Sequence, residues 1–173
     1  MTSFRKHILE KLLSTLCSII RSDYVLLDVC LITNVGDLLI WQAFDDIKRY
    51  IPHKCLYTFG IETYITPKIS PKTTLVFMGG GNFGDLWERH SIFRHKVLND
   101  FPNNPVVQLP QSVWWENQDK MIDDINCFAN HKADVHICLR DRASYDIIKN
   151  KYVNVNTYLL PDLALAFDVT QFC

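Results

Sequence analysis

The sequence lacks a long hydrophobic run, an excess of charge of either sign, and closely spaced cysteines. No segment reaches the ~20 consecutive apolar residues that a membrane-spanning helix requires, so we expect no stable membrane span. Lysine plus arginine number 18 and aspartate plus glutamate 19, and the resulting net charge of −1 provides no basic field that would attract nucleic acid. These absences favour small molecules or proteins as partners.

The six cysteines are scattered, and no two are close enough in sequence to form a Cys-x-x-Cys metal site. A chain of 173 residues can bury a core without disulfides, so a reducing cytoplasm is the expected compartment. The six histidines contain no His-x-x-x-His pair, and the phosphate-binding pattern G-x-x-x-x-G-K-[ST] is missing. We therefore expect neither a metal nor a resident cofactor.

Residues 1–22 have the pattern of an amphipathic helix. Apolar residues recur there at helical spacing, at Phe4, Ile8, Leu12, Leu16, Ile19 and Ile20. We expect this face to pack on its own domain, and the alternative is peripheral attachment to the inner face of a membrane.

Beyond this helix, apolar β-type segments alternate with segments of helical period. Six strands are expected, at 24–32, 55–59, 73–78, 106–109, 135–139 and 155–160, the fourth ended by Pro110. Such alternation, with short connections, is typical of right-handed βαβ units. The sequence thus predicts an α/β fold over residues 1–173, Rossmann-like, with a mostly parallel sheet of about six strands between two helical layers and a core at 23–168.

Glycine is scarce, with six residues in the chain, yet four of them lie within positions 79–84. A tight strand-to-helix turn needs one or two glycines, and each further glycine costs up to ~1 kcal/mol relative to alanine. We therefore expect a ligand to approach the backbone of Gly79, Gly80, Gly81 and Asn82, where main-chain N–H groups can hold an anion.

Polar residues follow four of the expected strands. Ligands of open parallel sheets bind outside these carboxyl ends of the strands. The polar residues are Asn34, Gly36 and Asp37 after the first strand, Gly79–Asp85 after the third, Gln111 after the fourth, and Arg140 and Ser144 after the fifth. If they share one site, the strand order 2-1-3-4-5 is favoured, because it makes the first and third strands neighbours.

Each of these residues also has a structural explanation. Capping of a helix accounts equally well for Asn34 and Asp37, and it also accounts for Ser144. Arg140 could pair with a nearby carboxylate. The adjacent Trp114 and Trp115 fit a sugar-stacking surface and a hydrophobic lid equally well.

Five segments come in an order that resembles the polysaccharide pyruvyl transferase family, and especially its bacterial exopolysaccharide-biosynthesis members. These segments are 34–37, 79–86, 109–112, 140–145 and 160–162. The resemblance extends from about Asp28 to Asp162, which is nearly the whole chain.

The resemblance implies an enzyme that transfers pyruvate from phosphoenolpyruvate, as a ketal, to a sugar of an exopolysaccharide or its lipid-linked precursor. It also implies one half of a GT-B-type architecture, in which two Rossmann-like halves face each other across a cleft. The family's Arg-Leu-His-Gly segment, to which the acid is assigned, has no counterpart in this sequence. We therefore expect the chain to be inactive alone, and to work with a carboxyl-terminal half or in a homo-oligomer.

The placement of these residues on one rim suggests hypothetical roles in this chemistry. Asp37 and Asp85 are the catalytic candidates, which would orient sugar hydroxyls or act as base. Substrate binding is assigned to Asn34, Gly36, Gly79, Gly80, Gly81, Asn82, Gln111, Arg140 and Ser144, with Arg140 on the anionic donor. The alternatives are a GT-B-like glycosyltransferase half that uses a nucleotide sugar, and a non-catalytic remnant that serves as a binding module.

Overall fold

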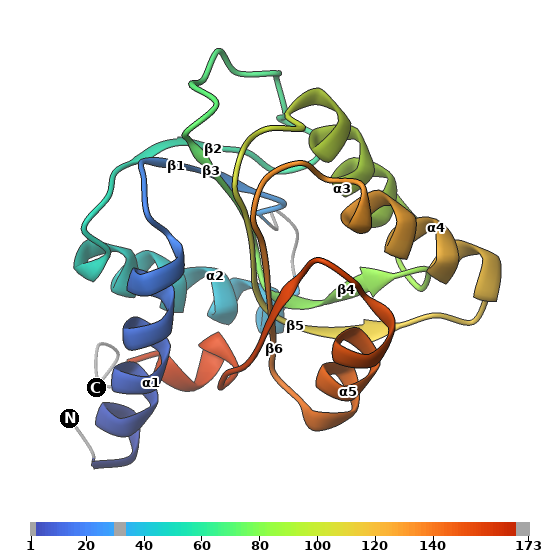
Figure 1. Ribbon diagram of the computed structural model, residues 1–173. Helices are drawn as coiled ribbons and strands as arrows, with labels where there is room; N and C mark the ends of the chain where they lie inside the picture. Colours follow the sequence, from blue (N-terminus) through green and yellow to red (C-terminus); the bar gives the residue numbers. More distant parts are fainter. Residues whose placement is uncertain (1–2, 30–33, 169–173) are drawn as a thin grey trace.

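A parallel sheet of seven strands forms the centre of the protein (Figure 1). The computed structural model describes residues 3–29 and 34–168. The strands are β1 (Tyr24–Leu27), β2 (Cys55–Thr58), β3 (Thr74–Phe77), β4 (Gly80–Gly84), β5 (Val106–Trp114), β6 (Val135–Leu139) and β7 (Asn156–Leu159). Their order is β2-β1-β3-β5-β6-β7, with β4 paired to β5, and every pairing is parallel. The expected neighbourhood of the first and third strands is thus confirmed.

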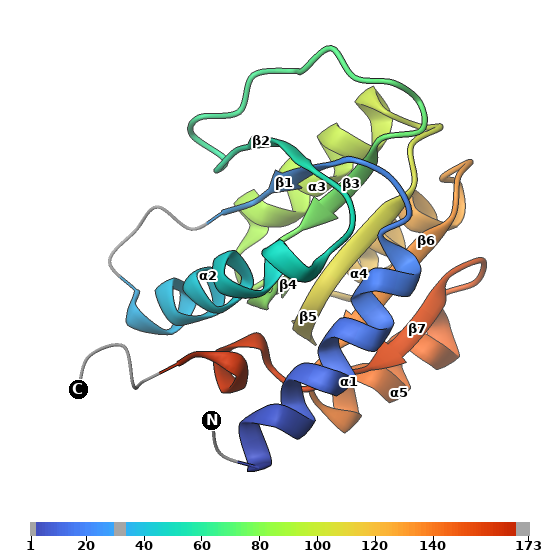
Figure 2. The same ribbon diagram turned by 90° about the vertical axis from the view of Figure 1, so that its left-hand side faces the viewer.

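Helices cover both faces of the sheet, which gives the three-layer Rossmann-like arrangement that the sequence predicts (Figures 1 and 2). On one face lie α1 (Ser3–Ile19), α2 (Val35–Ile47) and the short η2 (Leu163–Ala166), and η1 (Lys48–Tyr50) extends α2. On the other face lie α3 (Glu88–Asp100), α4 (Gln118–Ala129) and α5 (Arg142–Lys151). Each face has its own apolar cluster, because the central strands present buried side chains to both sides.

Helix α1 packs on its own domain. Its stripe of Ile8, Leu12, Leu16 and Ile19 is buried in the apolar cluster that also contains residues of α2 and η2, whereas Phe4 is exposed. Within residues 3–29 and 34–168, no helix combines the length and the apolar character needed to cross a membrane.

The glycine-rich segment differs from its predicted form. It is neither a loop nor the start of a helix: Gly80–Gly84 forms strand β4, and β5 continues through Pro110 to Trp114. Pro110 is tolerated because the β5–β6 register shifts between Gln108 and Gln111, which takes the residue without an N–H out of the regular ladder.

Two of the glycines are required by this close strand pairing. A Cβ on Gly79 would lie 2.4 Å from the carbonyl oxygen of Pro110, and one on Gly84 would lie 1.8 Å from that of Trp114. Gly84 also has φ +114°, a conformation that other residues rarely adopt. Although Gly79, Gly81 and Gly84 fit the spacing G-x-G-x-x-G, α3 begins only at Glu88, so the strand-turn-helix of a dinucleotide site is not formed here.

Candidate active site

A cavity of about 550 Å³ opens beyond the carboxyl ends of β1 and β3, within the usual size range of ligand pockets. Seven of the predicted site residues line it: Asn34, Gly36, Asp37, Gly79, Gly81, Asn82 and Arg140. The loops after the first, third and fifth predicted strands therefore meet in one pocket, as their positions in a parallel sheet require.

Asn34 and Asp37 combine capping with a place in the pocket. The Asn34 side chain accepts the N–H of Gly36 at 3.0 Å, which caps α2, and its Nδ2 donates to Asp37 Oδ2 at 2.9 Å. Asp37 lies in the first turn of α2, where the helix dipole favours a negative charge. Its carboxylate is thus held at the pocket wall by the turn that starts the helix.

Arg140 follows β6 and is fixed by two hydrogen bonds. Its Nε donates to Ser112 Oγ at 2.8 Å and its Nη1 to Asp162 Oδ2 at 2.7 Å. Nη2 has no hydrogen-bond partner among residues 3–29 and 34–168, and a Cβ on Gly81 would lie 3.3 Å from it. The missing side chain of Gly81 therefore leaves room for the end of the guanidinium in the pocket.

Three predicted residues lie behind the pocket wall. Gln111 is fully buried and donates from Nε2 to Asn82 Oδ1. Ser144 is buried at the start of α5, where its hydroxyl accepts the Val113 N–H at 3.0 Å and donates to Asp141 at 2.8 Å. Gly80 is also buried and does not line the cavity. These residues position the wall and do not reach the cavity.

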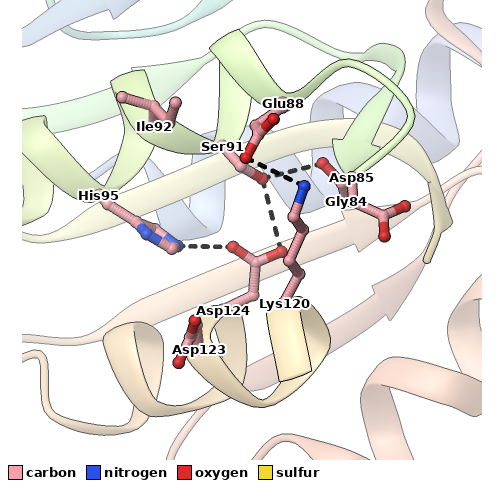
Figure 3. A pocket seen from close by; sticks show the side chains of 9 residues that line it. All are labelled: Gly84, Asp85, Glu88, Ser91, Ile92, His95, Lys120, Asp123 and Asp124. Carbon is pink, nitrogen blue, oxygen red and sulfur yellow. Dashed lines mark hydrogen bonds and ion pairs between the residues drawn. The ribbon is translucent and has the colours of Figure 1, made fainter. Parts of the chain in front are cut away.

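Asp85 is separated from the other predicted residues. It lines a second, smaller cavity between α3 and α4, of about 180 Å³ (Figure 3). Its carboxylate accepts the N–H groups of Glu116 at 2.9 Å and Asn117 at 2.7 Å. Partial desolvation raises the pKa of Asp85, but these N–H bonds and the charge of Lys120 together lower it. The expectation that Asp37 and Asp85 share a site is not met. Strand β4 runs alongside β5 as far as Trp114, so Asp85, which follows β4, lies next to the end of β5.

A buried polar network that the sequence did not predict borders the pocket. Asp28, directly after β1, is almost fully buried and has φ +61°. Its Oδ1 lies 2.7 Å from Nδ1 of His90 and its Oδ2 lies 3.4 Å from Nη2 of Arg94, both residues of α3. Asn82 joins the network through its Nδ2, 3.2 Å from Asp28 Oδ2. Asp28, Asn82 and His90 line the cavity, and Arg94 is buried behind it.

The sequence contains weak signals for this network. Asp28 interrupts an otherwise apolar strand segment, and Arg94 lies between the buried Phe93 and Val97 on the inward side of α3. A charged residue at such a position is rarely buried unless it is paired.

The tryptophans of the pocket are also different from those expected. Trp41 of α2 and Trp87 before α3 line the cavity, whereas Trp114 and Trp115 do not. Trp115 packs against Phe83 and donates from its indole N–H to Asp124 at 2.7 Å, which is a structural role. In the described ranges, no group of three or more His, Cys, Asp and Glu residues is arranged to hold a metal ion.

Comparison with known proteins matches residues 34–171 to a family model described as polysaccharide pyruvyl transferase. The chain belongs to the polysaccharide pyruvyl transferase family. It is 33% identical over 159 residues to the protein named "Putative pyruvyl transferase EpsO" of Bacillus subtilis (strain 168), covering 90% of this chain. It is 36% identical over 90 residues to "Pyruvyl transferase 1" of Schizosaccharomyces pombe, covering 51% of this chain. The resemblance noted in the sequence is confirmed.

The chain spans 49% of the length of the Bacillus subtilis relative and 22% of the yeast relative. A crystal structure of the functionally uncharacterised protein KP1_0663 from Klebsiella pneumoniae has a similar fold, with a TM-score of 0.67 at 21% identity. That match covers 100% of this chain and 60% of the Klebsiella chain.

Proposed function

We propose that this chain forms the donor-binding wall of a pyruvyl transferase. In this proposal the pocket holds phosphoenolpyruvate, and its pyruvyl group is transferred as a ketal to a sugar of an exopolysaccharide or its lipid-linked precursor. The activity belongs to a transferase completed by a second GT-B-type half or by another copy of the chain. We place the reaction in the cytoplasm, at the inner face of the membrane where a lipid-linked acceptor would be met.

The observation that carries this proposal is the position of Arg140. Its guanidinium lines the pocket, its Nε and Nη1 are anchored, and Gly81 leaves space beside Nη2. A fixed guanidinium is suited to a carboxylate or phosphate group, and phosphoenolpyruvate carries both. The described cysteines, Cys17, Cys55, Cys127 and Cys138, are free thiols, which is compatible with a reducing compartment.

Two aromatic side chains of the pocket suit a sugar. Trp41 and Trp87 line the cavity, and an indole ring provides an apolar face for the C–H face of a pyranose. Asp37 would orient an acceptor hydroxyl by accepting its hydrogen bond. This arrangement would place donor and acceptor in the same cavity, which pyruvyl transfer requires.

A thermal-shift comparison of phosphoenolpyruvate with nucleotide sugars tests the proposal. A ligand at 100 times its dissociation constant adds about 2.7 kcal/mol of stability, which corresponds to a rise in Tm of roughly 5–10 °C for a chain of this size. We expect this rise with phosphoenolpyruvate and none with inorganic phosphate at the same concentration. A rise with a nucleotide sugar alone would support a glycosyltransferase half, and no rise with either ligand would leave only a non-catalytic module.

A further inference from the structure

We propose that His90, oriented by Asp28, is the base that accepts a proton from the acceptor hydroxyl. The inference rests on the proposed function for the identity of the substrate, but its geometric part is independent of it. His90 lines the cavity that also contains Arg140 and Asp37, and its side chain is 19% exposed, so one edge of the ring can reach a ligand.

The contact with Asp28 determines which ring nitrogen faces the pocket. Nδ1 of His90 lies 2.7 Å from Asp28 Oδ1 and 3.0 Å from Asn82 Nδ2. The carboxylate can only accept and makes the shorter contact, and Asn82 Nδ2 can donate to Asp28 Oδ2 instead, so we assign the proton to Nδ1. In the neutral ring Nε2 is then the unprotonated nitrogen, and no partner for it is found within the described ranges. The dyad therefore presents a proton acceptor to the cavity through Nε2.

The rest of the network fixes the carboxylate that orients His90. Arg94 is buried beside Asp28 Oδ2 and also donates to the backbone carbonyl and the Oδ1 of Asn82. Gln111 donates to the same Asn82 oxygen, which turns the Asn82 amide nitrogen toward Asp28. The Arg94 guanidinium thus compensates the charge of the buried Asp28 carboxylate. Such a network resists rotation of the imidazole.

The step balances without an oxidant or reductant. One acceptor hydroxyl forms a C–O bond to C2 of phosphoenolpyruvate while a general acid of the completed enzyme gives a proton to the methylene C3, and His90 Nε2 takes the proton of that hydroxyl. The second hydroxyl then forms its bond to C2 as the C2–O bond to phosphate breaks. Of the two protons lost by the hydroxyls, one is matched by the proton gained at C3, and the other leaves on the phosphate, which returns His90 to its neutral form.

The same helix provides an internal control. His95 also contacts a carboxylate, Asp124, but through Nε2 and in the smaller cavity (Figure 3). A contact through Nε2 favours the opposite tautomer. The two histidines, five residues apart on α3, should therefore differ in which ring nitrogen carries the proton.

Two-bond nitrogen–proton NMR spectra of the ¹⁵N-histidine-labelled chain test the geometry without needing turnover. At a pH where both rings are neutral, we expect the Nδ1–H form for His90 and the Nε2–H form for His95. The spectra of His90→Gln and His95→Gln variants assign the two signals. An Nε2–H form at His90 would overturn the proposal, because the base nitrogen would then face Asp28.

Reactivity and turnover test the role. Diethyl pyrocarbonate, which modifies accessible neutral imidazole, should modify His90, and phosphoenolpyruvate should slow this modification without affecting His95. In the transferase completed by its second half or second copy, phosphate release is measured with acceptor sugar. There His90→Gln should lower the rate about 100-fold, as expected for loss of a general base, and His95→Gln should leave it unchanged. Phosphoenolpyruvate affinity should be kept in both variants. If phosphoenolpyruvate does not slow the modification of His90, or if the rate is unchanged in His90→Gln, the base role is contradicted. If the parent chain does not bind phosphoenolpyruvate at all, the proposed function is contradicted instead.

Discussion

Replacing Arg94 by methionine is expected to destabilise the protein more than any exposed charge substitution. The side chains of Arg94 and Asp28 are each 1% exposed, and Arg94 also lies over the ring of Phe83 at 4.8 Å. Methionine keeps much of the volume and the apolar contact but removes the charge. Asp28 is then left as a buried carboxylate whose remaining partners are His90 and Asn82.

Removing one partner of a buried ion pair costs about 3–5 kcal/mol, since the remaining charge is uncompensated. For a chain of this length we expect Tm to fall by roughly 6–20 °C. The double variant Asp28→Asn/Arg94→Met removes both charges, so its loss should be smaller than the sum of the two single losses.

Urea denaturation followed by circular dichroism measures these differences. The matched control is Arg89→Met, on the same helix, whose exposed pair with Glu62 is worth about 0–1 kcal/mol. If Arg94→Met is no more destabilising than Arg89→Met, or if the losses in the double variant are additive, the buried pair does not stabilise the network.

Two further predictions concern residues of the motifs. Gly79→Ala and Gly84→Ala should strongly lower the Tm, because each new Cβ would clash with a backbone carbonyl. Gly81→Ala should remain folded, because the nearest contact of its Cβ is Nη2 of Arg140 at 3.3 Å. Equal Tm values for the three variants would contradict this. Asp85→Asn should cost about 1 kcal/mol at neutral pH through weakened acceptance of two N–H groups. Because the folded-state pKa of Asp85 is lowered, its contribution is present above the usual carboxyl pKa and is lost as pH falls through the folded-state value, so parent and variant should converge in acid; a constant gap would refute this.

The sheet and its helical layers could be predicted because the apolar pattern is continuous. Strand β6 coincides with its predicted range, and β1 and β3 lie within theirs, since strands buried on both faces leave an unbroken apolar run. The convergence of the first, third and fifth loops also followed from the rule for parallel sheets. These features depend on local sequence and on topology.

Strand β4 and the buried network could not be predicted from local sequence. Glycine has low strand propensity, and β4 exists only because β5, about 30 residues further on, provides a backbone edge. Without β4, the sequence pattern places Asp85 on the same rim as Asp37, which is wrong. The pairing of Asp28 with His90 joins residues 62 positions apart, and neither residue has a sequence pattern that identifies its partner.

The central claim is that Arg140 holds the anionic donor, and calorimetric titration with phosphoenolpyruvate tests it most directly. Arg140→Ala should weaken binding by about tenfold or more, since a charge-assisted hydrogen bond is worth about 1.5–3 kcal/mol. Arg142→Ala is the matched control, because its side chain is 73% exposed, pairs with Asp146 and does not line the pocket. It should bind as the parent does. Unchanged affinity in Arg140→Ala would contradict the account.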